Sequence, residues 1–177
     1  MIHHLVVLQS IKMLRNLLAF LDEAEQYAAK KEFDIAILLR ARLAPDQYDL
    51  IRQVQIACDT VKLGVARLAG AEKDVPYHDD KEQTLAEVRT RIEQVIAYLG
   101  RFTPKNFEGA AERVITQARW KGKTLTGEEF LIHHVIPNFY FHISTAYAIL
   151  RHNGVALGKR VFTGDLPFRR PAGNDQP

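Results

Sequence analysis

The stretch TGEEFLIHHVIPNFYFHISTAYAILRHNG, residues Thr126–Gly154, carries a complete set of helix signals and most of the unusual chemistry of the chain. Its opening TGEE forms a capping box, which satisfies two backbone donors and predicts a helix that begins near Gly127. Asn153 and Gly154 tolerate the left-handed conformation in which helices commonly end. Pro137 lies between these signals and has no N–H, so a kink is predicted beside the polar residues.

Three polar side chains on this predicted helix, His134, Asn138 and His142, are spaced four residues apart and therefore share one face. Neutral imidazole is a ligand for zinc, nickel or iron, so the row is a candidate metal site. Histidines of intermediate burial are also common in protein cores. The spacing alone leaves both interpretations open.

The rest of the chain has three further apolar periods of helical spacing, which together predict an all-α fold. The predicted elements are a helix over 2–31, a short turn over 35–39, helices over 45–69 and 80–99, a linker over 71–80 and a small β-hairpin within 101–125. The second long helix is expected to start at Pro45, because proline is favoured in a first turn. Asp80 is expected to cap the third.

Length and charge suit one globular domain, assigned to residues 1–164, with a flexible C-terminal tail over 165–177. The formal charge is +3 and falls to +1 without the last twenty residues, which argues against a nucleic-acid surface. The single cysteine, Cys58, is predicted to be a buried, inert thiol. No signal peptide is recognised and no stretch is judged long enough to span a membrane, so a cytoplasmic protein without a membrane partner is expected.

The run PNFYFHISTAYAILRHNG (Pro137–Gly154) resembles the last helix of the DinB/YfiT-like superfamily of metal-dependent enzymes, and more closely an uncharacterised bacterial family within it. That helix tends to carry a His-x-x-x-His pair followed by Leu-Arg and Gly. His142 falls on the second histidine, whereas Asn138 replaces the first. Further echoes lie in ARLAPD (41–46), QVQIACD (53–59), ARLAG (66–70) and Gly158-Lys159.

This resemblance implies a four-helix bundle in up-down-down-up order, a small β-hairpin before the last helix, and a homodimer. In the superfamily a histidine on the second helix completes the metal site; here Gln55 or Asp59 would face the same cavity. The resemblance thus implies His142 and Asp59 as metal ligands or catalytic groups, for zinc or nickel. The residues expected to contact a substrate are Gln55, Asn138, His134, Tyr140 and Trp120.

Two functions remain open at this point. The first is a divergent DinB-like enzyme or small-molecule-binding protein with its site around His142; by analogy with some relatives, its cosubstrate would be a thiol. The second is a non-catalytic dimeric scaffold, in which Gln55, Asp59, Asn138 and His142 form an internal hydrogen-bonded network without a metal.

Overall fold

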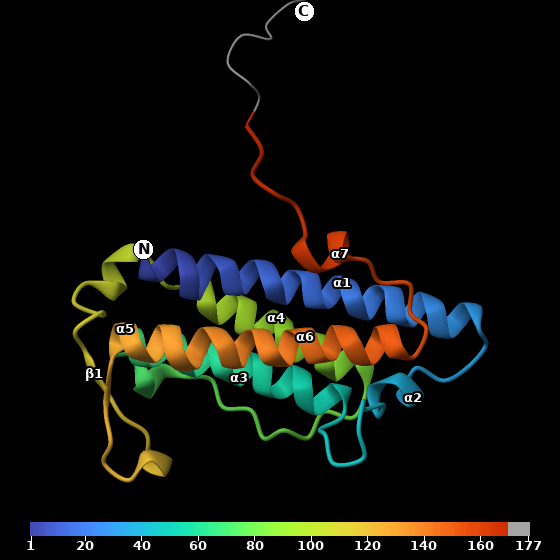
Figure 1. Cartoon of the computed structure of the whole chain (residues 1–177), viewed down its shortest axis with the longest axis horizontal. Coiled ribbons are helices and arrows are strands. Elements are labelled where there is room, and N and C mark those ends of the chain that lie inside the picture. Colours follow the sequence, from blue (N-terminus) through green and yellow to red (C-terminus); the bar gives the residue numbers. More distant parts are fainter. Residues whose placement is uncertain (170–177) are drawn as a thin grey trace, which may run out of the picture.

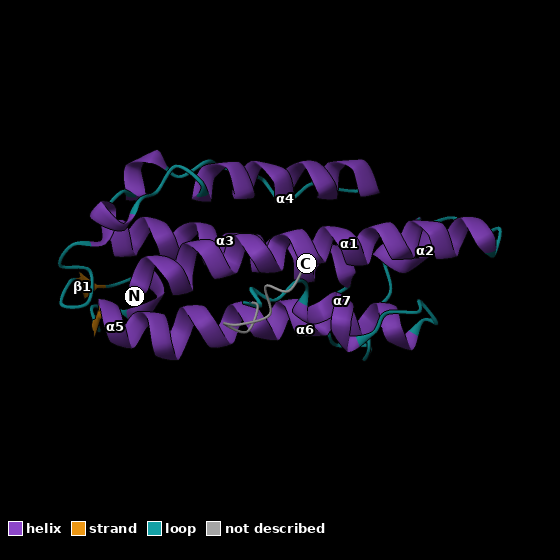
Figure 2. Cartoon of the chain, turned by 90° about the horizontal axis from the view of Figure 1, so that it is seen from above, coloured by secondary structure: helices purple, strands orange, loops and turns teal. Residues whose placement is uncertain are grey.

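The computed structural model of the chain, which describes residues 1–169, is built on four long helices that lie side by side (Figures 1 and 2). They are α1 (Gln9–Lys30), which continues a π-helical turn η1 (His4–Leu8), α3 (Leu50–Ala69), α4 (Leu85–Leu99) and α6 (Ile136–His152). Helices α1 and α6 run in one direction, and α3 and α4 run in the other (Figure 1). The predicted all-α, up-down-down-up bundle is therefore confirmed.

Shorter elements connect the long helices. They are α2 (Ala36–Leu39), the 3-10 turns η2 (Glu72–Asp74), η3 (Pro104–Phe107) and η4 (Ala118–Trp120), the strands β1 (Val114–Ile115) and β2 (Leu125–Thr126), the helix α5 (Gly127–Phe130), the π-helical turn η5 (Leu131–Val135) and α7 (Lys159–Thr163). The segment between α3 and α4 returns along the length of the bundle, so that these two helices are parallel (Figure 1). This crossover brings loop side chains against both helices.

Helix α3 is the central element, since it packs more extensively than any other helix against both α4 and α6. The apolar stripe predicted for it is fully buried and consists of Leu50, Val54, Ala57, Val61 and Leu68. Each buried leucine or valine of this stripe contributes roughly 1.5–3 kcal/mol to folding. Helix α3 thus gives one face to α6 and another to α4, and polar side chains lie on both.

Two predicted helix starts are wrong. Helix α3 begins after Asp49, whose carboxylate accepts from the backbone N–H of Arg52 at 3.0 Å, and not at Pro45. Helix α4 begins after Thr84, which forms a reciprocal capping box with Glu87, and not at Asp80. Pro45 merely tolerates a first turn, whereas the carboxylate of Asp80 is taken up by Arg52 and Arg91. In both cases the helix starts at the residue whose side chain does satisfy the orphan N–H groups.

The last helix begins as predicted, with Thr126 and Glu129 forming a capping box around Gly127. The irregularity expected at Pro137 takes the form of the π-helical turn η5 immediately before it, and the helical path continues through both elements. Pro137 occupies the first turn of α6, where its missing N–H costs least. The predicted β-hairpin is confirmed but short: Val114 pairs with Thr126 and Ile115 pairs with Leu125.

The helical run His4–Lys30 is long and apolar enough to cross a membrane by length and composition, so the expectation that no stretch reaches that length is wrong. In the bundle its inner face is buried, with Leu14, Leu17 and Leu21 fully covered. Of the expected C-terminal tail, residues 165–169 form neither helix nor strand and are exposed. Residues 170–177 lie outside the described part of the chain.

Candidate functional site

The row predicted on the last helix does face α3, and each member meets a different partner. Asn138 donates through Nδ2 to the hydroxyl of Thr60 at 2.7 Å, and that hydroxyl donates to the carbonyl of Ile56. One turn further along α6, Nδ1 of His142 lies 2.7 Å from Oε1 of Gln53. The placement of His142 inside the bundle, 7% exposed, is the one predicted.

The contacts of Gln53 determine which nitrogen of His142 carries the proton. Nε2 of Gln53 donates to the carbonyl of Tyr48 at 3.1 Å, which turns its amide oxygen toward the imidazole. That oxygen only accepts, so Nδ1 of His142 donates and Nε2 keeps its lone pair. Burial, together with the charge of Arg52, lowers the pKa of His142 to about 4. The imidazole is therefore neutral at physiological pH.

This protonation state predicts a pH dependence of stability that belongs to His142. Between about pH 6.5 and about pH 4, the unfolded chain protonates this histidine and the native chain does not. The free energy of unfolding should therefore fall as the pH falls, by about 1.4 kcal/mol per pH unit from this group. His142→Asn retains a donor at the Nδ1 position and should remove that slope.

Urea denaturation at a series of pH values measures this difference. His152→Asn, at an exposed position on the same helix, is the control and should follow the native chain. Parallel pH profiles for the native chain and His142→Asn would show that the imidazole titrates as freely in the fold as in the unfolded chain.

The structure does not bring Asp59 and Gln55 to His142, which corrects the predicted site. Oδ1 of Asp59 accepts from Nη2 of Arg91 at 2.9 Å and pairs with Nζ of Lys62 at 2.8 Å. The side chain of Gln55 bonds Arg52 and Glu82. The helical period explains the error: relative to Gln53, Asp59 is rotated by about 120° around α3, whereas Thr60, seven residues on, is rotated by only about 20°.

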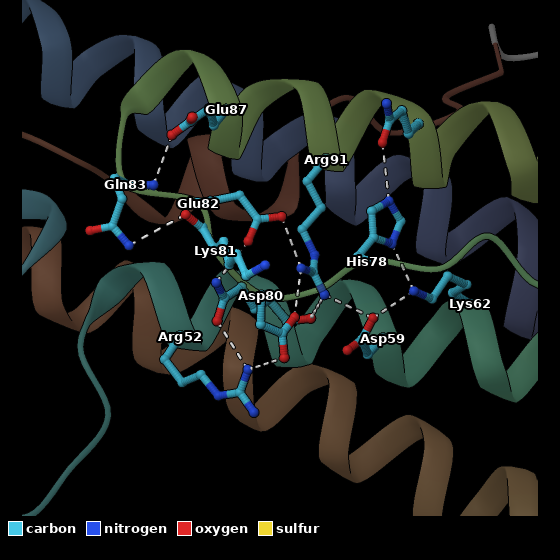
Figure 3. A network of polar contacts seen from close by, with 12 residues as sticks. Arg52, Asp59, Lys62, His78, Asp80, Lys81, Glu82, Gln83, Glu87 and Arg91 are labelled. Carbon is cyan, nitrogen blue, oxygen red and sulfur yellow. Dashed lines mark hydrogen bonds and ion pairs between the residues drawn. The ribbon is translucent and has the colours of Figure 1, made fainter.

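Arg91 is the centre of a polar cluster between α3, α4 and the crossover segment (Figure 3). Its side chain is 1% exposed and pairs with three carboxylates, those of Asp59, Asp80 and Glu82, at 2.7–2.9 Å. Asp80 has a positive φ of 57° and contacts Arg52 as well as Arg91. The cluster therefore clamps the crossover segment onto the bundle.

Two other side chains extend or underlie this cluster. His78, from the crossover, accepts at Nδ1 from Lys62 at 2.8 Å and donates through Nε2 to Oε1 of Gln94 at 3.1 Å. Cys58 is fully buried beneath it, and burial raises the pKa of its thiol to about 12. The thiol stays protonated at neutral pH, as expected for an inert cysteine.

A cleft of about 250 Å³ lies between α3 and the start of the last helix, and we call it the α3–α6 cleft. It is lined by Ile56, Asp59, Thr60, Leu63, Arg67, Gln117, Arg119, Phe130, His134 and Asn138. Three predicted site residues, Asp59, His134 and Asn138, thus meet here. His142 lies one turn beyond its end.

The two aromatic residues predicted near the site have different positions. Trp120 packs edge-on against the rings of Phe130 and His134, with centroids 6.0 Å and 5.9 Å apart, and lines a cavity next to the cleft. Tyr140 accepts a hydrogen bond from Nε2 of Gln9 at 2.9 Å, so its hydroxyl points to α1. The structure thus places Tyr140 against α1 and not among the residues that line the cleft, because the helical rotation turns it away from α3.

Residues 2–163 match the model of a family described as a domain of unknown function, DUF1993. The chain belongs to the DUF1993 family. It is also similar to a solved structure, the crystal structure of a DinB family member protein from Shewanella denitrificans, with 56% sequence identity and a TM-score of 0.95. The similarity covers 97% of this chain and 96% of that one. No match is found among the curated proteins.

The fold family implies a three-ligand metal site, and the side chains of this DUF1993 chain do not fit one. The position of the first superfamily histidine holds Asn138, and the α3 partner of His142 is the amide of Gln53; neutral amides are weak ligands for zinc or nickel. Asp59, the carboxylate predicted as a metal ligand, is already paired with two cations. Within residues 1–169, no three His, Cys, Asp or Glu side chains gather as a metal site would require.

Proposed function

We propose that this DUF1993 protein binds a small polar molecule in the α3–α6 cleft, and that the binding does not depend on a divalent metal held by His142 and Asp59. The proposal rests on where the structure places the residues of the predicted site. His142 is hydrogen-bonded to Gln53 outside the cleft, while Asp59, His134 and Asn138 line it together. A concave site with a few convergent polar groups is where ligands bind most often.

Three groups in the cleft are suited to orient a polar molecule. Asn138 and Thr60 form a fixed pair, so their remaining lone pairs have a defined direction. Oδ1 of Asp59 is occupied by Arg91 and Lys62, whereas Oδ2 has no hydrogen-bond partner among the described residues. That oxygen accepts a hydrogen from a ligand or serves as a general base toward one. If the protein is an enzyme, Asp59 is the group that acts there, and His142 supports α6.

Two measurements on protein purified without chelator test this proposal. Elemental analysis should find well under one zinc or nickel ion per chain. A thermal-shift screen of polar small molecules should find ligands that stabilise the native chain, and that lose this effect in Asn138→Leu. Ser144→Leu, on the exposed side of the same helix, is the matched control and should keep it.

Stoichiometric zinc or nickel that is lost in both His142→Ala and Asp59→Asn would overturn the proposal in favour of a metal-dependent enzyme. A protein that binds none of the compounds and sediments as a stable dimer would instead be the non-catalytic dimeric scaffold. That alternative is supported by Leu5, Leu8 and Ile132, which are 41%, 44% and 49% exposed. Apolar side chains of this size on a surface are typical of protein contacts when they cluster.

A further inference from the structure

Two arginines from different parts of the chain face the α3–α6 cleft. Arg67 comes from the last turns of α3, and Arg119 comes from the η4 turn of the hairpin. Arg119 donates through Nη2 to Nε2 of His134 at 3.1 Å, because guanidinium cannot accept. The guanidinium carbon of Arg67 lies 6.0 Å from the centre of the Phe130 ring. Both cations are therefore held in place by the walls of the cleft.

Hydrogen-bond donors in this cleft outnumber the acceptors that they meet. Nε2 of Gln117 is buried and has no hydrogen-bond partner among the described residues. Nε of Arg67 is also buried and lacks a well-aligned acceptor, although Oε1 of Glu72 lies 3.3 Å away as an ion pair. A buried donor without an acceptor destabilises the native chain, so a ligand whose oxygen accepts from the amide of Gln117 is favoured at this place.

The electrostatic environment of the cleft is positive. Burial, and then the charges of Arg119 and Arg67, lower the pKa of His134. Burial also lowers the pKa of Arg67 and outweighs the opposing effect of Glu72, while the charge of Arg119 lowers it further. Asp59 is the one carboxylate in the lining, and its charge is neutralised by ion pairs with Arg91 and Lys62, which do not line the cleft. Glu72, which pairs with Arg67, is 62% exposed, so solvent screens its charge.

A second cavity of about 540 Å³ shares Arg119 and His134 with the cleft. It is lined in addition by Trp120, Lys121, Lys123, Thr124, Leu125 and His133, and no acidic residue contributes to it. The two cavities together present cations and the side chain of Trp120. This combination suits a molecule that has an anionic end and an apolar or aromatic body.

We propose that the α3–α6 cleft takes a small organic oxyanion, a carboxylate or a phosphate ester, held by Arg67, Arg119 and the amide of Gln117. The apolar part of the ligand lies against Trp120 in the adjoining cavity. This inference rests on the proposed function and adds the chemical class of the ligand. Arg67 and Arg119 supply charge-assisted donors to its oxygens, and Gln117 supplies a neutral one.

Titrations followed by NMR of the His134 ring test the inference at constant ionic strength, with inorganic phosphate, acetate and benzoate as separate probes. At least one probe should give a saturable shift and raise the pKa of His134, because a bound anion offsets the nearby arginine charges. Arg119→Gln and Arg67→Gln should each weaken that binding at least tenfold. Arg119 is exposed, so its replacement should leave the fold intact, which circular dichroism verifies.

Arg15→Gln is the matched control, since Arg15 is exposed on α1 outside both cavities. Saturation by phosphate identifies the phosphate class, and saturation by acetate or benzoate identifies the carboxylate class. The inference is overturned if no probe saturates, or if Arg15→Gln weakens binding as much as Arg119→Gln does. If uncharged compounds bind through Asn138 and none of the three anions binds, the proposed function holds and the oxyanion inference is wrong.

Discussion

Replacing Arg91 with methionine is expected to lower the free energy of unfolding by about 3–5 kcal/mol, which is the usual cost of removing one partner from a buried ion pair. The guanidinium is 1% exposed and pairs with Asp59, Asp80 and Glu82. Its Nη2 also donates to the carbonyl of Gln55 at 3.3 Å. Methionine fills much of the same volume but leaves the carboxylates facing each other without their central cation.

Arg89→Met, on the same helix, is the matched control. Arg89 also pairs with two acids, Asp22 and Glu25, but those carboxylates are 51% and 58% exposed. Surface pairs contribute about 0–1 kcal/mol, so this variant should unfold almost like the native chain in urea. Equal losses in the two variants would mean that the Arg91 cluster stabilises the bundle no more than a surface pair does.

The pH dependence gives the Arg91 prediction a second test. Burial alone would raise the pKa values of Asp80 and Glu82. Hydrogen bonds from Arg52 and Arg91 outweigh burial and lower the pKa of Asp80, and hydrogen bonds from Arg91, the backbone and Gln55 lower that of Glu82. A carboxyl group whose pKa is lower in the native chain than in the unfolded chain stabilises the native state at pH values above its ordinary pKa. This stabilisation is lost as the pH falls toward the lowered pKa. The difference between the native chain and Arg91→Met should therefore shrink between about pH 5 and about pH 3.

The sequence is informative about the fold wherever apolar periodicity and capping chemistry agree. The capping box at Thr126 and the buried stripe of α3 were both predictable from spacing. The start of α3 was not, because Pro45 and Asp49 are both plausible near a first turn. Only the observed hydrogen bond from Arg52 N–H to the Asp49 carboxylate distinguishes them. Where two local signals have similar strength, the hydrogen bond that forms decides the start of the helix.

The candidate site was harder to predict, since it depends on helix rotation. The polar residues of α3 were known, but not which of them face α6. The seven-residue spacing of Gln53 and Thr60 was the available signal, because two helical turns return a side chain to the same face. Arg91 was also detectable, as a charged residue among the apolar positions Val88, Ile92 and Val95. That Arg67 and Arg119 line one cleft was not predictable from the sequence. They are 52 residues apart, and only the position of the hairpin brings them together.

Gly127→Ala is expected to be nearly as damaging as Arg91→Met, for a purely steric reason. A Cβ atom on Gly127 would lie 1.8 Å from the carbonyl oxygen of Ala110 and 3.2 Å from Cδ2 of Leu68. Ala110 is fully buried, and the next residue accepts a backbone hydrogen bond from Glu128 at 3.0 Å, so the loop cannot simply move away. Forcing extra volume into a packed site typically costs about 1–3 kcal/mol, and a clash with backbone belongs at the upper end.

Gly100→Ala separates this clash from the general effect of replacing glycine. Gly100 has a right-handed helical conformation and its Cβ would meet nothing closer than 3.4 Å, so alanine there should be neutral or stabilise by about 0.4–1 kcal/mol. Because α5 also contacts both hairpin strands, Gly127→Ala should broaden the NMR signals of Trp120 and His134 together with its loss of stability. A variant that unfolds like Gly100→Ala would mean that the 110–113 segment is not held against the start of α5, and the hairpin wall of the cleft would then lack its support.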